Sequence, residues 1–211
     1  MSITRFIPRS ALLVYAVLRN AMDKAATYTD KAKMPLPLDV YDRLAEYLPM
    51  LSNEMRELDA AEVAQTGASI HKWPAFDRSV LFCSHFIICF NNGILRGEFP
   101  ANHRGFYNLD VNSARVPVMK SETELKTVAE NIRLGEAARV AAGGKPMSNP
   151  TAAEVETAFQ AYFTLAQSQS TLKDNTAKEQ KDISCILDEG ILLVIDIYDE
   201  LEHKFRHETD S

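Results

Sequence analysis

Apolar residues along this chain recur mainly at intervals of three and four, and convincing alternation with a period of two is absent. The region 39–67 shows this pattern most regularly. Its apolar positions alternate in steps of three and four, which is typical of a helix packed against neighbouring helices. These positions are Tyr41, Leu44, Leu48, Leu51, Met55 and Leu58. The pattern predicts an all-α fold, in which Pro49 kinks or restarts this helix and Gly67 ends it.

Two other helices have recognisable sequence signals at their ends. The helix over 10–33 is expected to begin at Ser10, whose hydroxyl can accept a hydrogen bond from a free amide of the first turn, and to stop at the prolines that follow. A later helix is expected to begin at Ser121. Together with Glu124 this serine forms a capping box, in which each side chain satisfies a free backbone amide of the other. We expect Gly143 and Gly144 to end this helix.

The segment 79–95 is the most apolar part of the chain, and it is apolar nearly all round a helical wheel. A helix of this kind is normally buried on every side, so we expect it to form the axis of a bundle. Trp73 and Pro74 are suitable residues for its first turn. The segment falls short of the roughly 20 apolar residues that a membrane span requires, so no span is expected.

Residues 96–120 show no helical period, which predicts one long irregular connection. Connections of this length tend either to be functional or to pack as straps across the core. Aromatic residues gather in and around it, namely Trp73, Phe76, Phe99, Phe106 and Tyr107. We favour a role as a core strap over a ligand pocket or an interface anchor.

The region 151–207 leaves two structures open. No glycine or proline interrupts it before Gly190, and its apolar stripe stops at a polar stretch over 167–182 before resuming in phase. One interpretation is a single long helix whose polar middle is uncovered by partners. The other is a helical hairpin that turns near Lys173. The ordinary length of helices favours the hairpin.

Length and charge limit the classes of function. The chain has 211 residues, which fits a single helical domain over 1–211 that can bury a core without metals or disulfides. Its formal net charge is −6, and no block of Lys and Arg with interleaved aromatics is present. These features disfavour binding to nucleic acid or to an anionic membrane surface.

The cysteines and the N-terminus bear on the compartment. Cys83, Cys89 and Cys185 are odd in number and lie in apolar surroundings, which indicates reduced core thiols and a cytoplasmic location. The apolar run 11–18 follows two arginines and so resembles a signal peptide in outline. Its shortness and the charges that follow at once disfavour that interpretation.

One constellation has the spacing of metal ligands. Asp196, Glu200, His203 and His207 share one helix face, and Glu200 and His203 have the spacing that carboxylate-bridged di-iron bundles use on two of their helices. A full site needs that motif twice, together with two more carboxylates, and no other histidine follows a glutamate at this spacing. A solvated helix face near a C-terminus is therefore favoured, and no metal or cofactor is expected.

Other residues with reactive side chains have simpler explanations. His85 has no nucleophile or orienting acid assigned to it, so a core histidine is favoured over a catalytic base. Burial disfavours Cys83 and Cys89 as nucleophiles. The glycines before Lys145 follow a helix, whereas a phosphate loop precedes one.

These observations predict an antiparallel helical bundle of five or six helices with one long irregular connection. We expect a non-enzymatic structural or interaction protein that self-associates, as a homo-oligomer, through helix faces and aromatic-rich loops, or that binds a protein partner. The alternative is a metal-binding bundle that uses the carboxylate and histidine face of the C-terminal helix.

Overall fold

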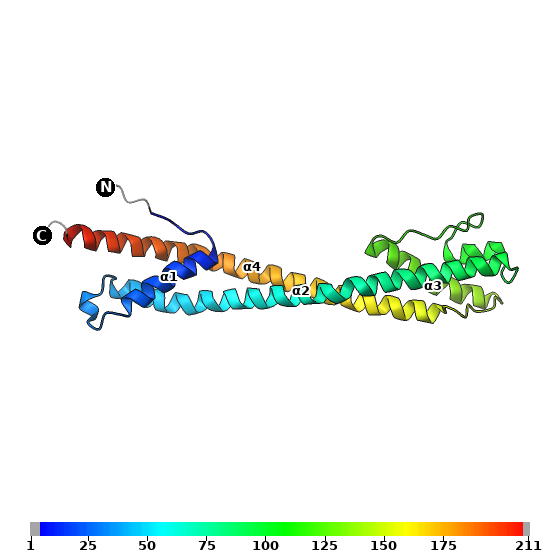
Figure 1. The fold of residues 1–211 in the computed structure, drawn as a ribbon, viewed down its shortest axis with the longest axis horizontal. Coiled ribbons are helices and arrows are strands. Elements are labelled where there is room, and N and C mark those ends of the chain that lie inside the picture. The colour runs from blue at the N-terminus through cyan, green and yellow to red at the C-terminus, as the bar shows by residue number, and fades with distance from the viewer. Residues whose placement is uncertain (1–4, 209–211) are drawn as a thin grey trace. The chain divides into compact units, whose positions relative to one another are not determined.

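The computed structural model describes residues 5–208, and the side chains of the last two of these are not described. All regular elements in this range are helical, which confirms the predicted all-α class (Figure 1). They are listed here in chain order: α1 (Ala11–Ala25), η1 (Lys31–Lys33), α2 (Leu38–Leu95), η2 (Ala101–Tyr107), α3 (Glu122–Ala141) and α4 (Ala152–Glu208). The predicted long connection lies between α2 and α3 and contains the short 3-10 helix η2.

The chain divides into two compact units, whereas a single domain was expected. Unit 1 contains the described residues up to Ala64 and from Leu172, and unit 2 contains Gln65–Thr171. Both α2 and α4 therefore contribute residues to both units. Each unit has its own hydrophobic core and is described separately below.

The core of unit 1 joins α1 to the first part of α2 and the last part of α4. Val14 and Leu18 of α1, Leu44 and Leu51 of α2, and Val194 of α4 are all fully buried. These α2 positions belong to the predicted stripe, so the stripe correctly marked a packed face. The helix continues through Pro49, which is exposed.

Two glycines mark places where elements approach closely. A Cβ atom added to Gly190 of α4 would lie 2.2 Å from Oη of Tyr47. Tyr47 donates a hydrogen bond of 2.9 Å to the carbonyl of Ile186. In unit 2, a Cβ on Gly135 of α3 would lie 2.4 Å from the carbonyl oxygen of Phe106. Glycine is needed at Gly135 because a larger residue would meet backbone, whereas at Gly190 a larger residue would displace the side chain of Tyr47.

The predicted caps are confirmed. The hydroxyl of Ser10 accepts a hydrogen bond from the amide of Leu13 at 3.4 Å. The amide of Glu124 donates to the hydroxyl of Ser121 at 3.2 Å, and the amide of Ser121 donates to the Glu124 carboxylate at 2.9 Å. Gly143, with a φ of 90°, follows the end of α3.

Two predicted boundaries are wrong. The first helix ends at Ala25 and not near residue 33, where only the short η1 occurs. The helix over 39–67 does not end at Gly67, because α2 is continuous through that residue and through Pro74. A glycine costs a helix only about 1 kcal/mol relative to alanine. Buried contacts, such as those of Phe76 in unit 2, offset costs of this size.

The hairpin predicted for 151–207 is also wrong, because α4 is one helix of 57 residues. Its polar middle is not uncovered. In unit 2, Gln169 is buried and donates to the hydroxyl of Ser69 at 2.5 Å. In unit 1, Thr176 and Glu179 are buried. The in-phase stripe was therefore the informative signal, with polar residues occupying some of the buried positions.

Candidate functional site

The exposed face of α2 in unit 2 carries large apolar side chains. We call it the α2 stripe and define it as Ile70, Leu81, Ile88 and Leu95. Their exposed fractions are 66%, 63%, 44% and 82%. At 100° per residue, the other three residues fall within about 20° of Ile70 around the helix axis. They therefore form one line along the helix, and this line has no partner among the described residues of unit 2.

Three of the four stripe residues lie in an uncharged part of the helix, whereas the exposed Asp77 falls on the same line between Ile70 and Leu81. No Asp, Glu, Lys or Arg occurs from Ser79 through Leu95, and Arg78 and Arg96 flank that segment. Trp73 lies one turn beyond Ile70 and is also exposed. Apolar surface that is contiguous, exposed and bordered by charges is typical of an interaction site.

The opposite face of the same segment is buried. Cys83, Phe86, Ile87 and Phe90 lie in the core of unit 2. The expectation that 79–95 is buried on every side is therefore wrong. Among the described residues, the core that this face forms with α3, α4 and the 96–120 connection does not include Leu81, Ile88 or Leu95.

α2 also contains the one stretch, within residues 5–208, that is long and apolar enough to cross a membrane by length and composition. Of that window, 39% is buried inside the structure. The core helix of a soluble protein satisfies the same criterion, so the stretch by itself is weak evidence for a span.

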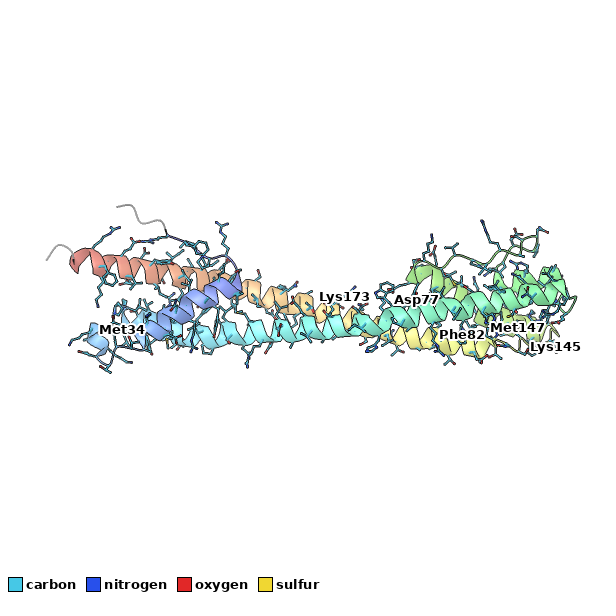
Figure 2. The ribbon with its side chains drawn as sticks, in the orientation of Figure 1. Met34, Asp77, Phe82, Lys145, Met147 and Lys173 are labelled. Carbon is cyan, nitrogen blue, oxygen red and sulfur yellow. The ribbon has the colours of Figure 1, made fainter. Side chains whose placement is uncertain are left out.

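A buried ionic cluster in unit 2 links α3 to η2 and to the connection between α3 and α4. Arg139 of α3 is fully buried and donates to Glu136 at 2.9 Å and to Oη of Tyr107 at 2.7 Å. Tyr107 in turn donates to Glu136. The amide of Met147 donates to Glu136 at 2.7 Å, and Arg139 donates to the carbonyl of Lys145 at 2.7 Å. Figure 2 labels Lys145 and Met147, which lie in the connection between α3 and α4.

This cluster organises the core and offers little access to a substrate. The guanidinium of Arg139 lies over the rings of Phe99 and Phe90, at 4.8 and 5.5 Å from their centroids. Burial raises the pKa of Tyr107, and its hydrogen bond to Glu136 raises the pKa further. Tyr107 is therefore a neutral hydrogen-bond donor at ordinary pH. The sequence did not reveal this cluster, because its members are 29 and 32 positions apart.

The 96–120 connection packs as a strap. Arg104 is buried and donates to the side chain of Asn91, and it also reaches the carbonyls of Asp110 at 2.6 Å and Arg115 at 3.1 Å. Of the predicted aromatic group, Phe76 and Tyr107 are buried, Phe99 and Phe106 are half-buried, and Trp73 is exposed. These burials agree with a core strap for all but Trp73.

The histidine and the cysteines considered as reactive residues differ in burial, and two of them differ from the prediction. His85 is exposed, so it is not a core histidine. Cys83 is buried, and burial raises its pKa to about 12, which keeps the thiol protonated. Cys89 is half-buried and Cys185 is exposed, so a core position is wrong for Cys185. All three are free thiols.

The predicted carboxylate and histidine face is not assembled into a ligand set. Asp196 forms an ion pair with Arg43 at 2.8 Å. Glu200 and His203 line an open groove of about 630 Å³ beside Pro35 and Leu36. The side chain of His207 lies outside the described part of the chain. Among the described residues, the donor atoms of Asp196, Glu200 and His203 do not converge on a point that a metal ion could occupy.

A different acidic group does converge, in unit 1. One carboxylate oxygen from each of Glu54, Glu179 and Asp182 lies within 4.8 Å of the other two. Glu54 belongs to α2, and the other two belong to the polar stretch of α4. The sequence contained no signal for this group, since Glu179 lies one position away from the in-phase stripe and Glu54 lies on another helix.

Comparison with known proteins adds no relative. No protein-family model matches the chain, and searches of curated proteins and of solved structures also give no match. The class that fold and site define is therefore an all-α helical protein with an uncovered apolar face on one of its helices.

Proposed function

We propose that the protein is a non-enzymatic interaction protein that associates with a second copy of itself through the α2 stripe. The observation that carries this proposal is the exposure of Ile70, Leu81, Ile88 and Leu95 along one line of α2. Each buried apolar side chain of this size contributes about 1.5–3 kcal/mol when it leaves water, so the stripe offers a substantial driving force for association.

The distribution of charge allows a second copy to occupy the stripe. The chain has a net charge of −6, so two copies repel each other over most of their surfaces. The segment 79–95 carries no Asp, Glu, Lys or Arg, so the part of the stripe from Leu81 to Leu95 is a face on which two copies can approach without that repulsion. A twofold interface presents the same patch on both partners, and a straight apolar line on a helix can meet its own copy in this way.

Trp73 extends the proposed contact. Its ring packs edge-on against Phe76 with centroids 5.8 Å apart, which fixes its orientation while leaving it exposed. Tryptophan is enriched among residues that dominate interface energies. The predicted role of aromatic-rich loops in association therefore narrows to this one aromatic residue, which lies on α2 itself.

Sedimentation velocity over a range of protein concentrations tests the proposal. The wild-type chain is expected to shift from monomer to dimer as concentration rises, and the double variant Leu81→Glu with Ile88→Glu is expected to remain monomeric. Both positions are exposed, so circular dichroism should show an unchanged helix content.

The matched control is Leu134→Glu, which adds a charge at an exposed leucine of α3 in the same unit. This control should dimerise like the wild type. A wild-type chain that is monomeric at every concentration, or a dimer that survives both glutamates on α2, would overturn the proposal. Capture of the wild type by neutral lipid vesicles in place of dimer formation would also count against it.

A further inference from the structure

We propose that Glu54, Glu179 and Asp182 of unit 1 form a binding site for a hard divalent cation of the calcium type. Glu179 and Asp182 are three residues apart on α4, so their side chains leave the same side of that helix. Glu54 comes from α2. One oxygen from each carboxylate lies within 4.8 Å of the other two, so three negatively charged groups converge between two helices.

The burial of Glu179 is a second, independent observation. Its side chain is only 8% exposed, and its Oε2 atom is buried with no hydrogen-bond partner among the described residues. A buried carboxylate oxygen without a donor costs free energy, and native structures rarely leave one unsatisfied. Glu136 in unit 2 shows the usual solution, since both of its oxygens accept hydrogen bonds.

Lys178 compensates for only part of the charge. Its ammonium group lies 3.1 Å from Oε1 of Glu179 and 3.2 Å from Oδ2 of Asp182. The lysine side chain is 66% exposed, so it can swing into solvent without breaking buried contacts. One lysine facing three carboxylates leaves a net negative charge at this point, which a divalent cation would neutralise.

The donor set selects the kind of ion. All three ligands are carboxylate oxygens, and hard cations prefer oxygen, whereas zinc prefers nitrogen and sulfur. Calcium binds oxygens at about 2.3–2.6 Å, so two oxygens on opposite sides of the ion are about 5 Å apart. The observed spacing lies within this limit. Glu54 and Asp182 are half-exposed, so water can complete the coordination.

Isothermal titration of the full-length chain with calcium chloride tests this site. We expect saturable binding of one ion per chain, with a Kd of the order of 10⁻⁴–10⁻³ M, as for sites with few protein ligands. Glu179→Gln and Glu54→Gln should each weaken binding by about tenfold or more. Lys178→Gln should tighten it, because the competing ammonium group is removed. Magnesium, which demands a stricter octahedron, should bind more weakly.

Asp188→Asn is the matched control, since it removes one exposed negative charge from the same helix and lies outside the cluster. It should bind calcium like the wild type. If Glu179→Gln fails to fold, the half-exposed Glu54→Gln carries the test. Absence of saturable binding up to about 10 mM calcium, well above the expected Kd range, would overturn the site. An equal loss of affinity in Asp188→Asn would also overturn it, because it would reduce the effect to overall charge.

Discussion

Both faces of α2 in unit 2 carry large apolar side chains, but the two faces have opposite environments. The face that carries Cys83, Phe86 and Phe90 is buried against the rest of the unit, whereas the face that carries Leu81, Ile88 and Leu95 is exposed. Apolar character alone therefore does not identify which face the chain buries within itself. One face stabilises the unit, and the other is the face through which we propose that two copies associate.

Truncation on the buried face should have the largest effect. Phe86→Ala removes a fully buried ring that packs edge-on against Tyr107 with centroids 5.5 Å apart. We expect the free energy of unfolding of unit 2 to fall by about 3–5 kcal/mol. The fluorescence of Trp73, which is the single tryptophan and lies in unit 2, reports this transition in urea. A loss below 1 kcal/mol would mean that the two faces are not distinct.

The next largest effect on stability is expected from the buried ion pair of Arg139 and Glu136. Arg139→Met leaves Glu136 buried without its cation, and such a change typically costs about 3–5 kcal/mol. The double variant Glu136→Gln with Arg139→Met should be less destabilised than the single variant, because no unpaired charge remains. Urea unfolding of both proteins measures the difference. Equal loss in the two variants would show that packing, and not the ion pair, is what Arg139 contributes.

The stability of α3, which packs on the buried face of α2, should depend on the cap at Ser121. Ser121→Ala is expected to lower the stability of unit 2 by about 1 kcal/mol. Hydrogen bonds from the amide of Lys120 and from Ser121 lower the pKa of Glu124. A carboxylate with a lowered pKa adds stability above its unfolded pKa of about 4.3, and that stability is lost as the pH falls through the folded pKa. Glu124→Gln should therefore flatten this part of the acid unfolding profile, whereas an unchanged profile would contradict the cap.

Truncation on the exposed face should have the smallest effect on stability. Leu81→Ala is expected to change the free energy of unfolding by no more than about 0.5 kcal/mol. The measurement belongs at a protein concentration at which the chain is monomeric. A loss comparable to that of Phe86→Ala would show that Leu81 has a partner within the chain, which contradicts its exposure.

The sequence predicted the helical class and the helix caps well, because both depend on residues close together in the chain. Ser121 with Glu124 is an example, since the entire motif spans four positions. It predicted helix ends less well at Gly67 and Pro74, because tertiary packing can offset the cost of a single breaker. It did not separate the faces of 79–95, since residue type does not show how many neighbours a helix has.

The candidate cation site also depends on residues that are far apart in the chain, so the sequence did not predict it. The chain positions of Glu54 and Glu179 are too far apart for any local motif to connect them. The carboxylate and histidine face near the C-terminus has an attractive local spacing, yet Asp196 pairs with Arg43. A set of metal ligands usually comes from two or more helices. The spacing of residues along one helix does not show which other helix lies beside it.

Spin labelling gives a direct test of self-association through the exposed face of α2. A nitroxide is attached at Ile88→Cys, and at Leu134→Cys as the control, in a background that carries Cys89→Ser and Cys185→Ser and keeps the buried Cys83. We expect the spectrum at residue 88 to broaden as protein concentration rises, because two labels meet across the interface, and the spectrum at residue 134 to stay sharp. Sharp spectra at both positions at every concentration would contradict it.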